Sequence, residues 1–444
     1  MGCCVAHIHR LFTGLSFPPY VVNCKHIMSH WSLFKFGGAS VKDADGFRNA
    51  VRLIQAYGQH DQIVVLSAMG KTTNTLESYL DARDQGDIRA SETLLKDLAM
   101  AHEDCLKDLG ILDDTLIAEL KAIWQGLRAV KVEWSYGERY DATVSAGELA
   151  STKIMAAALE HAGLPCHWQD VRSWIQTDGR HRRATVNWAT TQAAIHQGLQ
   201  SGLYVTQGFI AGGPDGQTTT LGREGSDYSA AIIAHCLKAK TLTIWKDVQG
   251  VMSGDPQLID DVTLLSQIPY QEAIELAFYG ASVIHPKTIQ PIQRNGSQLH
   301  VRSFKDPEQP HTVIGDFKKL KPEVPCWIEE SDQVLIEVST DDLSFLQEEH
   351  LAQVYRVFAD SGVMVNLAQH AAVSSLFCVR SDRVAIPEAF EALDQSFNLT
   401  IEEGLVLTTV RRPDEDAHMW LAERGEVLLE QHHGDVTQVL LRPS

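Results

Sequence analysis

The chain has 444 residues and a formal net charge of −19. Hydrophobic residues make up 44% of it, which allows a sizeable core and excludes global disorder. A nucleic acid or an anionic membrane needs a basic face, so the acidic balance argues against both partners. No apolar run reaches the length of a membrane span, and we expect a cytoplasmic protein of two or three domains.

The amino-terminal residues differ from the rest of the chain, because residues 1–27 contain Arg10 and Lys25 but no acid. We expect residues 1–31 to be an extension that is disordered or mis-started, with Met28 as the natural start. An intact mass that includes residues 1–27 would contradict this hypothesis. The eight cysteines form no C-x-x-C pair, which favours reduced, mostly buried thiols over a metal site.

Residues 33–41 read Leu-Phe-Lys-Phe-Gly-Gly-Ala-Ser-Val, an apolar run that leads into a lysine and a glycine pair. This pattern predicts a buried strand that ends in a phosphate-binding loop. Glycine lets backbone N–H groups approach an anion closely, and Lys35 adds a mobile positive charge. The alternative is a plain strand-terminal glycine turn, because a motif this short has many false positives.

Apolar runs that predict buried strands alternate with segments of helical period. The strands are expected at residues 61–69, 203–206 and 242–245, and the helices within 75–135 and at 273–279, before Gly280. This alternation predicts a three-layer αβα domain with a mostly parallel sheet. Ligands are then expected at the carboxyl ends of the strands.

The composition changes after Phe304, where prolines and lysines cluster. Residues 306–332 therefore read as a linker, and residues 333–444 as a separate α+β region. A weak internal repeat suggests two βαββ units, although chance explains so few matched positions as well. The repeat matches Gly362, His370, Val373 and Ser374 with Gly425, His433, Val436 and Thr437.

Two polar patches follow predicted strands or interrupt apolar sequence. Residues 67–74 carry hydroxyls and an amide that suit a small polar ligand or a helix N-cap. In residues 145–151, Glu148 stands among small and apolar residues, as a ligand-binding acid or as the acid of a capping box.

Two further patches lie later in the chain. Residues 218–231 combine three threonines, Arg223 between glycine-rich neighbours, and a Gly-Ser-Asp helix start that suits an anion. Arg223 can form a forked pair with a carboxylate. Lys246 and Asp247 end a strand before a glycine turn, a pattern that suits ribose and phosphate contacts.

Together these patches resemble the aspartate kinases of the amino-acid kinase superfamily, over residues 32–305. The resemblance rests on Lys-Phe-Gly-Gly at 35–38, Thr-Thr-Thr-Leu-Gly-Arg-x-Gly-Ser-Asp at 218–227, and Tyr-Gly-Ala-Ser-Val-Ile-His-Pro at 279–286. Residues 333–444 resemble, more weakly, the paired ACT regulatory domains of these enzymes, with a truncated second unit.

The resemblance implies transfer of the γ-phosphoryl group of ATP to the side-chain carboxylate of L-aspartate, giving 4-phospho-L-aspartate. This reaction begins the lysine, threonine and methionine branch of amino-acid biosynthesis. The resemblance also implies magnesium held largely by ATP, a homodimer, and an amino-acid effector at the ACT region. The chain lacks the length of a fused homoserine dehydrogenase and reads as monofunctional.

The family pattern assigns roles to individual residues. It implies that Lys35 neutralises the transferring phosphoryl group and that Asp227 orients the lysines. The residues implied at ATP are Lys35, Phe36, Gly37, Gly38, Ser67, Ser226, Lys246 and Asp247. The residues implied at L-aspartate are Thr73, Glu148 and Arg223, with Glu148 at the ammonium group and Arg223 at the α-carboxylate.

The sequence departs from the family at several positions. Glu224 replaces a glycine beside Arg223, and Lys246 stands where threonine is frequent. Met252, Gln257 and Ser282 replace tyrosine, arginine and lysine near the nucleotide. In the tail, alanines at 371 and 372 replace a Ser-Glu pair, so lysine feedback is expected to be altered or absent.

Two alternatives remain at this stage. One is another carboxylate- or carbamate-directed kinase of the superfamily, such as glutamate 5-kinase or acetylglutamate kinase. The other is a non-catalytic amino-acid sensor with a degenerate kinase domain. Glu148, Arg223 and the ACT-like tail argue against the first, and the presence of Lys35 with Asp227 argues against the second.

Overall fold

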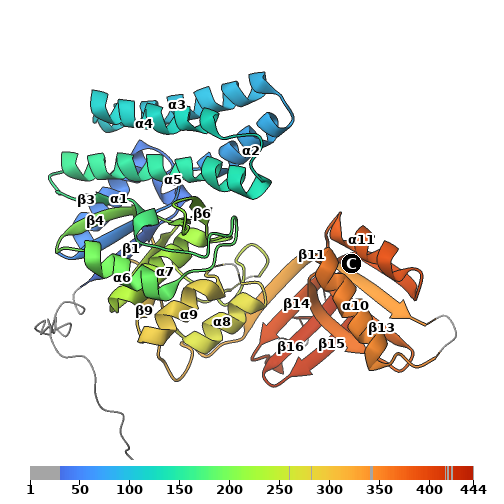
Figure 1. Cartoon of the computed structure of the whole chain (residues 1–444). Helices are drawn as coiled ribbons and strands as arrows, with labels where there is room; N and C mark the ends of the chain where they lie inside the picture. The colour runs from blue at the N-terminus through green and yellow to red at the C-terminus, as the bar shows by residue number, and fades with distance from the viewer. Residues whose placement is uncertain are drawn as a thin grey trace, which may run out of the picture.

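The computed structural model describes residues 31–259, 261–281, 283–340, 344–415, 417, 420–421 and 424–443. These residues form a larger α/β domain followed by a smaller domain on an antiparallel sheet (Figure 1). The prediction for residues 1–30 lies outside the described residues. Trp31, which was assigned to the extension, is buried in the core beside Tyr204.

The larger domain is built on one sheet, and its neighbouring strands are parallel except for β9 and β10. Within the described residues the strands follow one another as β3 (His167–Gln169), β4 (Leu203–Gln207), β2 (Gln62–Leu66), β1 (Ser32–Phe36), β7 (Thr241–Lys246), β9 (Gln298–Ser303), β10 (Thr312–Gly315) and β8 (Gln267–Pro269). The predicted mostly parallel sheet is confirmed. A separate hairpin pairs β5 (Ile210–Gly212) with β6 (Thr218–Thr220).

Helices cover both faces of this sheet and complete the three layers (Figure 1). One face carries α1 (Ala44–Tyr57), α2 (Thr72–Asp84), α3 (Ile88–Leu109), α4 (Asp114–Gly126) and α5 (Tyr136–His161). The other carries α6 (Trp188–Gly198), α7 (Gly225–Leu237), α8 (Tyr270–Phe278) and α9 (Pro286–Asn295). Short 3₁₀ helices span Gly38–Val41, Leu127–Ala129 and Val171–Ser173.

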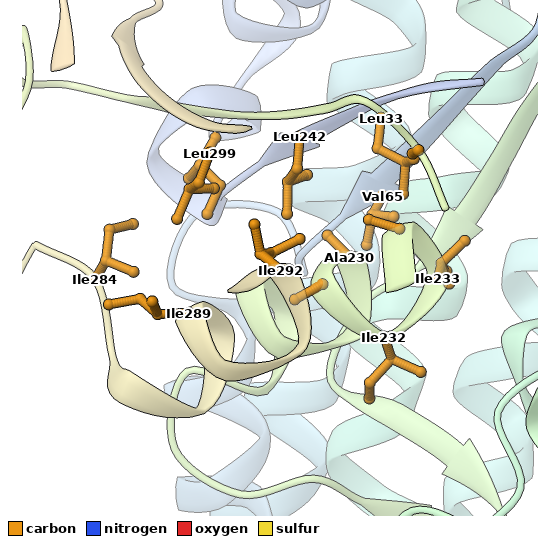
Figure 2. Close-up of a cluster of buried hydrophobic side chains, with 14 of the residues drawn as sticks. Leu33, Val65, Ala230, Ile232, Ile233, Leu242, Ile284, Ile289, Ile292 and Leu299 are labelled. Atoms are coloured by element: carbon orange, nitrogen blue, oxygen red, sulfur yellow. The ribbon is translucent and has the colours of Figure 1, made fainter. Parts of the chain in front are cut away.

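The alternation of side chains along β1 divides the core between the two faces. Leu33 packs with α7 and α9 on one face, whereas Phe34 and Phe36 pack with α1 and α5 on the other. Figure 2 shows the first of these cores, where Leu33 and Val65 of the sheet meet Ala230 of α7. Lys35 is on the same face as Leu33, near the carboxyl end of β1, which places its side chain at the edge where ligands bind.

The smaller domain has a single antiparallel sheet across both predicted repeats. Among the described residues its strands run in the order β12 (Val365–His370), β13 (Ser374–Arg380), β11 (Cys326–Ser339), β14 (Asn398–Arg411), β16 (Val436–Pro443) and β15 (Gly425–His433). Helices α10 (Glu348–Ser361) and α11 (Ala385–Leu393) pack on its first half. Because β11 and β14 each have 14 residues, they pass through both halves of the sheet and join them.

The structure differs from the sequence-based expectation in the segment predicted as a linker. Strand β10 lies within residues 306–332 and pairs with β8 and β9 of the larger domain. Thr312 is fully buried, and its hydroxyl donates to the carbonyl of Leu265 at 2.7 Å. This strand is hard to predict from the sequence because it has only four residues and its flanking prolines and lysines are typical of a linker.

Ion pairs connect the smaller domain to α8. Arg411 of β14 is almost fully buried, and its guanidinium pairs with Glu272 at 2.8 Å and also with Glu275. Arg412 donates to the same Glu272 carboxylate at 3.0 Å. In the part of the chain that the structure describes, no helix is both long enough and apolar enough to cross a membrane.

Candidate active site

A cavity of about 840 Å³ lies beside the ends of β1, β2 and β7 and the start of α7. Nine of the residues predicted from the sequence line it together: Lys35, Gly38, Ser67, Thr73, Glu148, Arg223, Ser226, Asp227 and Lys246. They come from five separate segments of the chain. Such convergence supports a shared site far better than any single motif does.

One end of this cavity, which we call the lysine end, holds Lys35, Asp227 and Lys246. The Lys35 Nζ lies 2.5 Å from Asp227 Oδ1, and the Lys246 Nζ lies 3.8 Å from Asp227 Oδ2. Asp227 sits in the first turn of α7, where a helix favours a negative charge. Two lysines therefore share one buried carboxylate and leave a net positive charge for an anion.

The glycine pair after β1 allows a second loop to approach closely. A Cβ added to Gly38 would come 2.6 Å from the carbonyl oxygen of Gly70 and 2.9 Å from that of Ala68. The Gly70 N–H donates to the carbonyl of Gly38 at 3.1 Å. Any side chain at position 38 would therefore force this second loop to shift.

Glu148 lies in the middle of α5 and is buried. The capping box of this helix is formed by Ser135 and Glu138, so the alternative role of Glu148 as a capping acid is wrong. Its Oε1 accepts from the Ala68 N–H at 3.3 Å, whereas its Oε2 is buried without a partner among the described residues. Burial raises the pKa of Glu148 to about 8, although the Ala68 N–H and the charge of Lys35 lower it.

A buried carboxyl group with this pKa, and with one oxygen that has no partner among the described residues, is suited to receive a cation from a ligand. Thr73 lines the same cavity from the first turn of α2. That helix has Lys71 as its N-cap residue, without a side-chain cap, so neither Thr72 nor Thr73 serves as the N-cap. We call the region around Thr73, Glu148 and Arg223 the carboxyl end of the cavity.

Arg223 is exposed on the cavity wall and precedes Glu224, the N-cap residue of α7. Glu224 has a left-handed backbone with φ of 52°, a conformation that glycine adopts at no steric cost. This explains why the family pattern has glycine here. In the described residues, the buried Oε2 of Glu224 has no hydrogen-bond partner.

Three predicted site residues do not line the cavity. The Phe36 side chain is fully buried and stacks on Trp245, with ring centroids 6.0 Å apart. Gly37 lies next to the cavity, since an added Cβ would come 3.4 Å from Lys35 Nζ. Asp247 is exposed after β7.

The other positions at which the sequence departs from the family pattern do not line the cavity or are not described by the structure. Met252 and Gln257 are not among the cavity-lining residues, and Ser282 lies outside the described residues. The predicted loss of nucleotide contacts at these three positions stays a prediction.

Sequence reasoning missed several residues that line the cavity. These are Tyr140, Arg182, Arg183 and Lys287. The basic run Arg-His-Arg-Arg at residues 180–183 was the available signal. It was overlooked because it follows no predicted strand or glycine turn.

The fold and the cavity define an α/β protein whose cavity has two lysines paired with a carboxylate at one end and a buried carboxyl group at the other. The model of the amino acid kinase family matches residues 31–303. The chain belongs to this family.

Known proteins resemble the chain over most of its length. Lysine-sensitive aspartokinase 3 of Escherichia coli is 29% identical over 395 residues, which is 86% of this chain and 87% of that protein. A bifunctional aspartokinase/homoserine dehydrogenase of Arabidopsis thaliana is 28% identical over 390 residues, and the match covers 84% of this chain but only 42% of that relative. The crystal structure of E. coli aspartokinase III in complex with aspartate and ADP has a TM-score of 0.76 and 26% identity, covering 92% of this chain and 96% of that one.

Proposed function

We propose that this protein is an aspartate kinase, which transfers the γ-phosphoryl group of ATP to the side-chain carboxylate of L-aspartate. The observation that carries the proposal is a single cavity lined by the Lys35–Asp227 pair and by Glu148 and Arg223. Glu148 matches the ammonium group of an amino acid, and Arg223 matches its α-carboxylate. The similarity to an aspartokinase solved with aspartate and ADP supports the same assignment.

The chemistry needs no general base, because a carboxylate is already an anionic nucleophile. Catalysis then depends on positioning and on stabilising charge in the transition state. In this proposal Lys35 neutralises the transferring phosphoryl group, and Lys246 assists on the ATP side. Asp227 holds both lysines, and the amides of Gly37 and Gly38 with the hydroxyls of Ser67 and Ser226 lie at the phosphates.

Magnesium is proposed to enter bound to ATP. Asp227 is the carboxylate of the lysine end, and each of its oxygens faces a lysine. Mg²⁺ prefers an octahedron of oxygens and keeps several waters. Its ligands would therefore come from the phosphates and water, and the ion would neutralise phosphate charge during transfer.

The function is tested by ATP-dependent hydroxamate formation with the purified protein. L-Aspartate, L-glutamate and N-acetyl-L-glutamate are compared as acceptors in the presence of hydroxylamine. We expect product with L-aspartate alone. Product with either other acceptor would indicate a different kinase of the family, and no product with any acceptor would favour a non-catalytic sensor.

We also propose a homodimer formed through the smaller domain, with 4-phospho-L-aspartate feeding lysine, threonine and methionine synthesis. The family resemblance carries this proposal. Light scattering of the purified protein should give twice the chain mass, and a monomer at micromolar concentration would contradict it. Activity measured with lysine, threonine and methionine tests for an effector, and strong inhibition by lysine would contradict the expected loss of lysine feedback.

A further inference from the structure

Arg182 adopts an unusual backbone conformation on the wall of the cavity. Its φ of 66° lies in the left-handed region, which is costly for a residue with a side chain. Such a conformation persists only where the surrounding structure holds it in place, and strained residues of this kind concentrate at functional sites. The contacts of Arg182 show what holds it and where its charge lies.

Asp141 of α5 is the residue that holds this loop. It is fully buried, and its Oδ2 accepts from the Arg182 N–H at 3.0 Å and lies 2.8 Å from His181 Nδ1. Its Oδ1 accepts from the Thr220 hydroxyl at 2.7 Å. One carboxylate therefore ties helix α5 to the loop of Arg182 and to β6, which ends three residues before Arg223.

The guanidinium of Arg182 is held over two aromatic rings. It lies 5.1 Å from the ring centroid of Tyr136 and 5.0 Å from that of Tyr140, a geometry typical of cation–π contacts. Within the described part of the chain, no carboxylate is close enough to form an ion pair with it. Arg182 thus presents an unneutralised positive charge on the cavity wall.

Arg182 is anchored to the elements that carry Glu148 and Arg223. Tyr140 and Asp141 precede Glu148 by about two turns of α5, so they share its side of the helix. Thr220, the other anchor, leads directly to Arg223. The Lys35–Asp227 pair is contributed by β1 and α7 instead.

We propose that Arg182 binds the side-chain carboxylate of L-aspartate, and that Asp141 is the residue that positions it. This inference rests on the proposed function. L-Aspartate has a second carboxylate beyond the two groups that Glu148 and Arg223 would bind. A guanidinium contact orients this carboxylate and offsets its repulsion by the triphosphate.

The main test is the Arg182→Gly variant, in which the substituted residue tolerates a positive φ. We expect the KM for L-aspartate to rise about tenfold, as for loss of a charge-assisted hydrogen bond. The KM for ATP should not change. The melting temperature should not fall, because the relief of backbone strain offsets the lost ring contacts. A residue with a purely structural role would instead lower the melting temperature and leave KM unchanged.

Lys238→Gly is the matched control. Lys238 has a φ of 50° at the C-cap of α7, away from the cavity. This variant should raise the melting temperature by about 2 °C through the same relief of strain, without changing either KM. An Arg182→Gly variant whose KM for L-aspartate equals that of the wild type overturns the proposal, as does one in which only the KM for ATP rises.

Asp141→Asn tests the positioning role. The asparagine cannot accept from all three donors, so the KM for L-aspartate should rise while kcat changes little. In the Arg182→Gly background the same substitution should add a much smaller increase. An equal increase in both backgrounds would contradict action through Arg182. Failure of the proposed function is distinguishable, because the wild-type protein would then give no product from L-aspartate at all.

Discussion

The two ends of the cavity hold charge in different ways. At the lysine end, Lys35 and Lys246 already face Asp227 in the free protein. At the carboxyl end, Glu148 is buried with one oxygen unpartnered among the described residues, and burial raises its pKa to about 8. The lysine end therefore already has its ion pairs before a ligand binds, whereas burial keeps Glu148 largely neutral at pH 7.

This difference indicates how the two substrates would be recognised. ATP would meet a preformed positive site, which costs little reorganisation. The ammonium group of L-aspartate would instead ionise Glu148 as it binds, because an adjacent positive charge favours the carboxylate. Binding of the amino acid should then release a proton, and binding of ATP at the lysine end should not depend on Glu148.

The largest effect is expected from Lys35→Ala, which removes the charge that meets the phosphoryl group. We expect kcat to fall by a factor on the order of 10³, in line with the loss of other transition-state contacts. Lys42→Ala is the control, since Lys42 is a mostly exposed lysine just after the same loop. Retention of more than a tenth of wild-type kcat in a folded Lys35→Ala protein would contradict the assigned role.

Glu148→Gln should raise the KM for L-aspartate about 100-fold and leave the KM for ATP unchanged, because only the charged contact with ammonium is lost. Steady-state kinetics measures both values. Glu160→Gln, an exposed acid near the end of the same helix, is the control. An equal rise in both KM values would argue against two distinct ends.

The same substitution has a predicted effect on stability. The pKa of Glu148 is raised in the folded state from 4.5 to about 8, so the native protein binds more protons than the unfolded chain between these values. Stability contributed by this group is present below about pH 4.5 and is lost as the pH rises toward 8. Glu148→Gln should therefore raise the melting temperature of the free protein at pH 8.5 and change it little at pH 5.

Much of this site was predictable from the sequence, because several of its residues stand in short local motifs. Lys35, Glu148 and Asp227 stand in motifs whose residue types suit their chemistry, and the alternating strands predicted where they would meet. The segment of β10 was misassigned because four residues between prolines carry too little pattern. Arg182 was missed because its role depends on Asp141, a contact 41 residues away that no local pattern reveals.

A smaller effect is expected from Lys246→Ala. Lys246 is partly exposed and lies farther from Asp227 than Lys35 does, so screening weakens its contribution. We expect the KM for ATP to rise about fivefold, with the KM for L-aspartate unchanged. An unchanged KM for ATP would remove Lys246 from the lysine end.

The smallest effect is expected from Glu224→Gly. It relieves a left-handed backbone and removes a carboxylate beside Arg223 whose Oε2 is buried without a partner among the described residues. The melting temperature should rise by about 2 °C, and the KM for L-aspartate should fall about twofold because a nearby negative charge is gone. A higher KM would mean that Glu224 itself contacts the substrate.

The most direct test of the contrast between the two ends is the number of protons released when L-aspartate binds. Isothermal titration in buffers of different ionisation enthalpy measures this number at pH 7 and pH 9, with ADP present. A pKa of about 8 for Glu148 predicts release of close to one proton per L-aspartate at pH 7 and close to none at pH 9. Equal release at both pH values, or the same release from Glu148→Gln, would contradict the account.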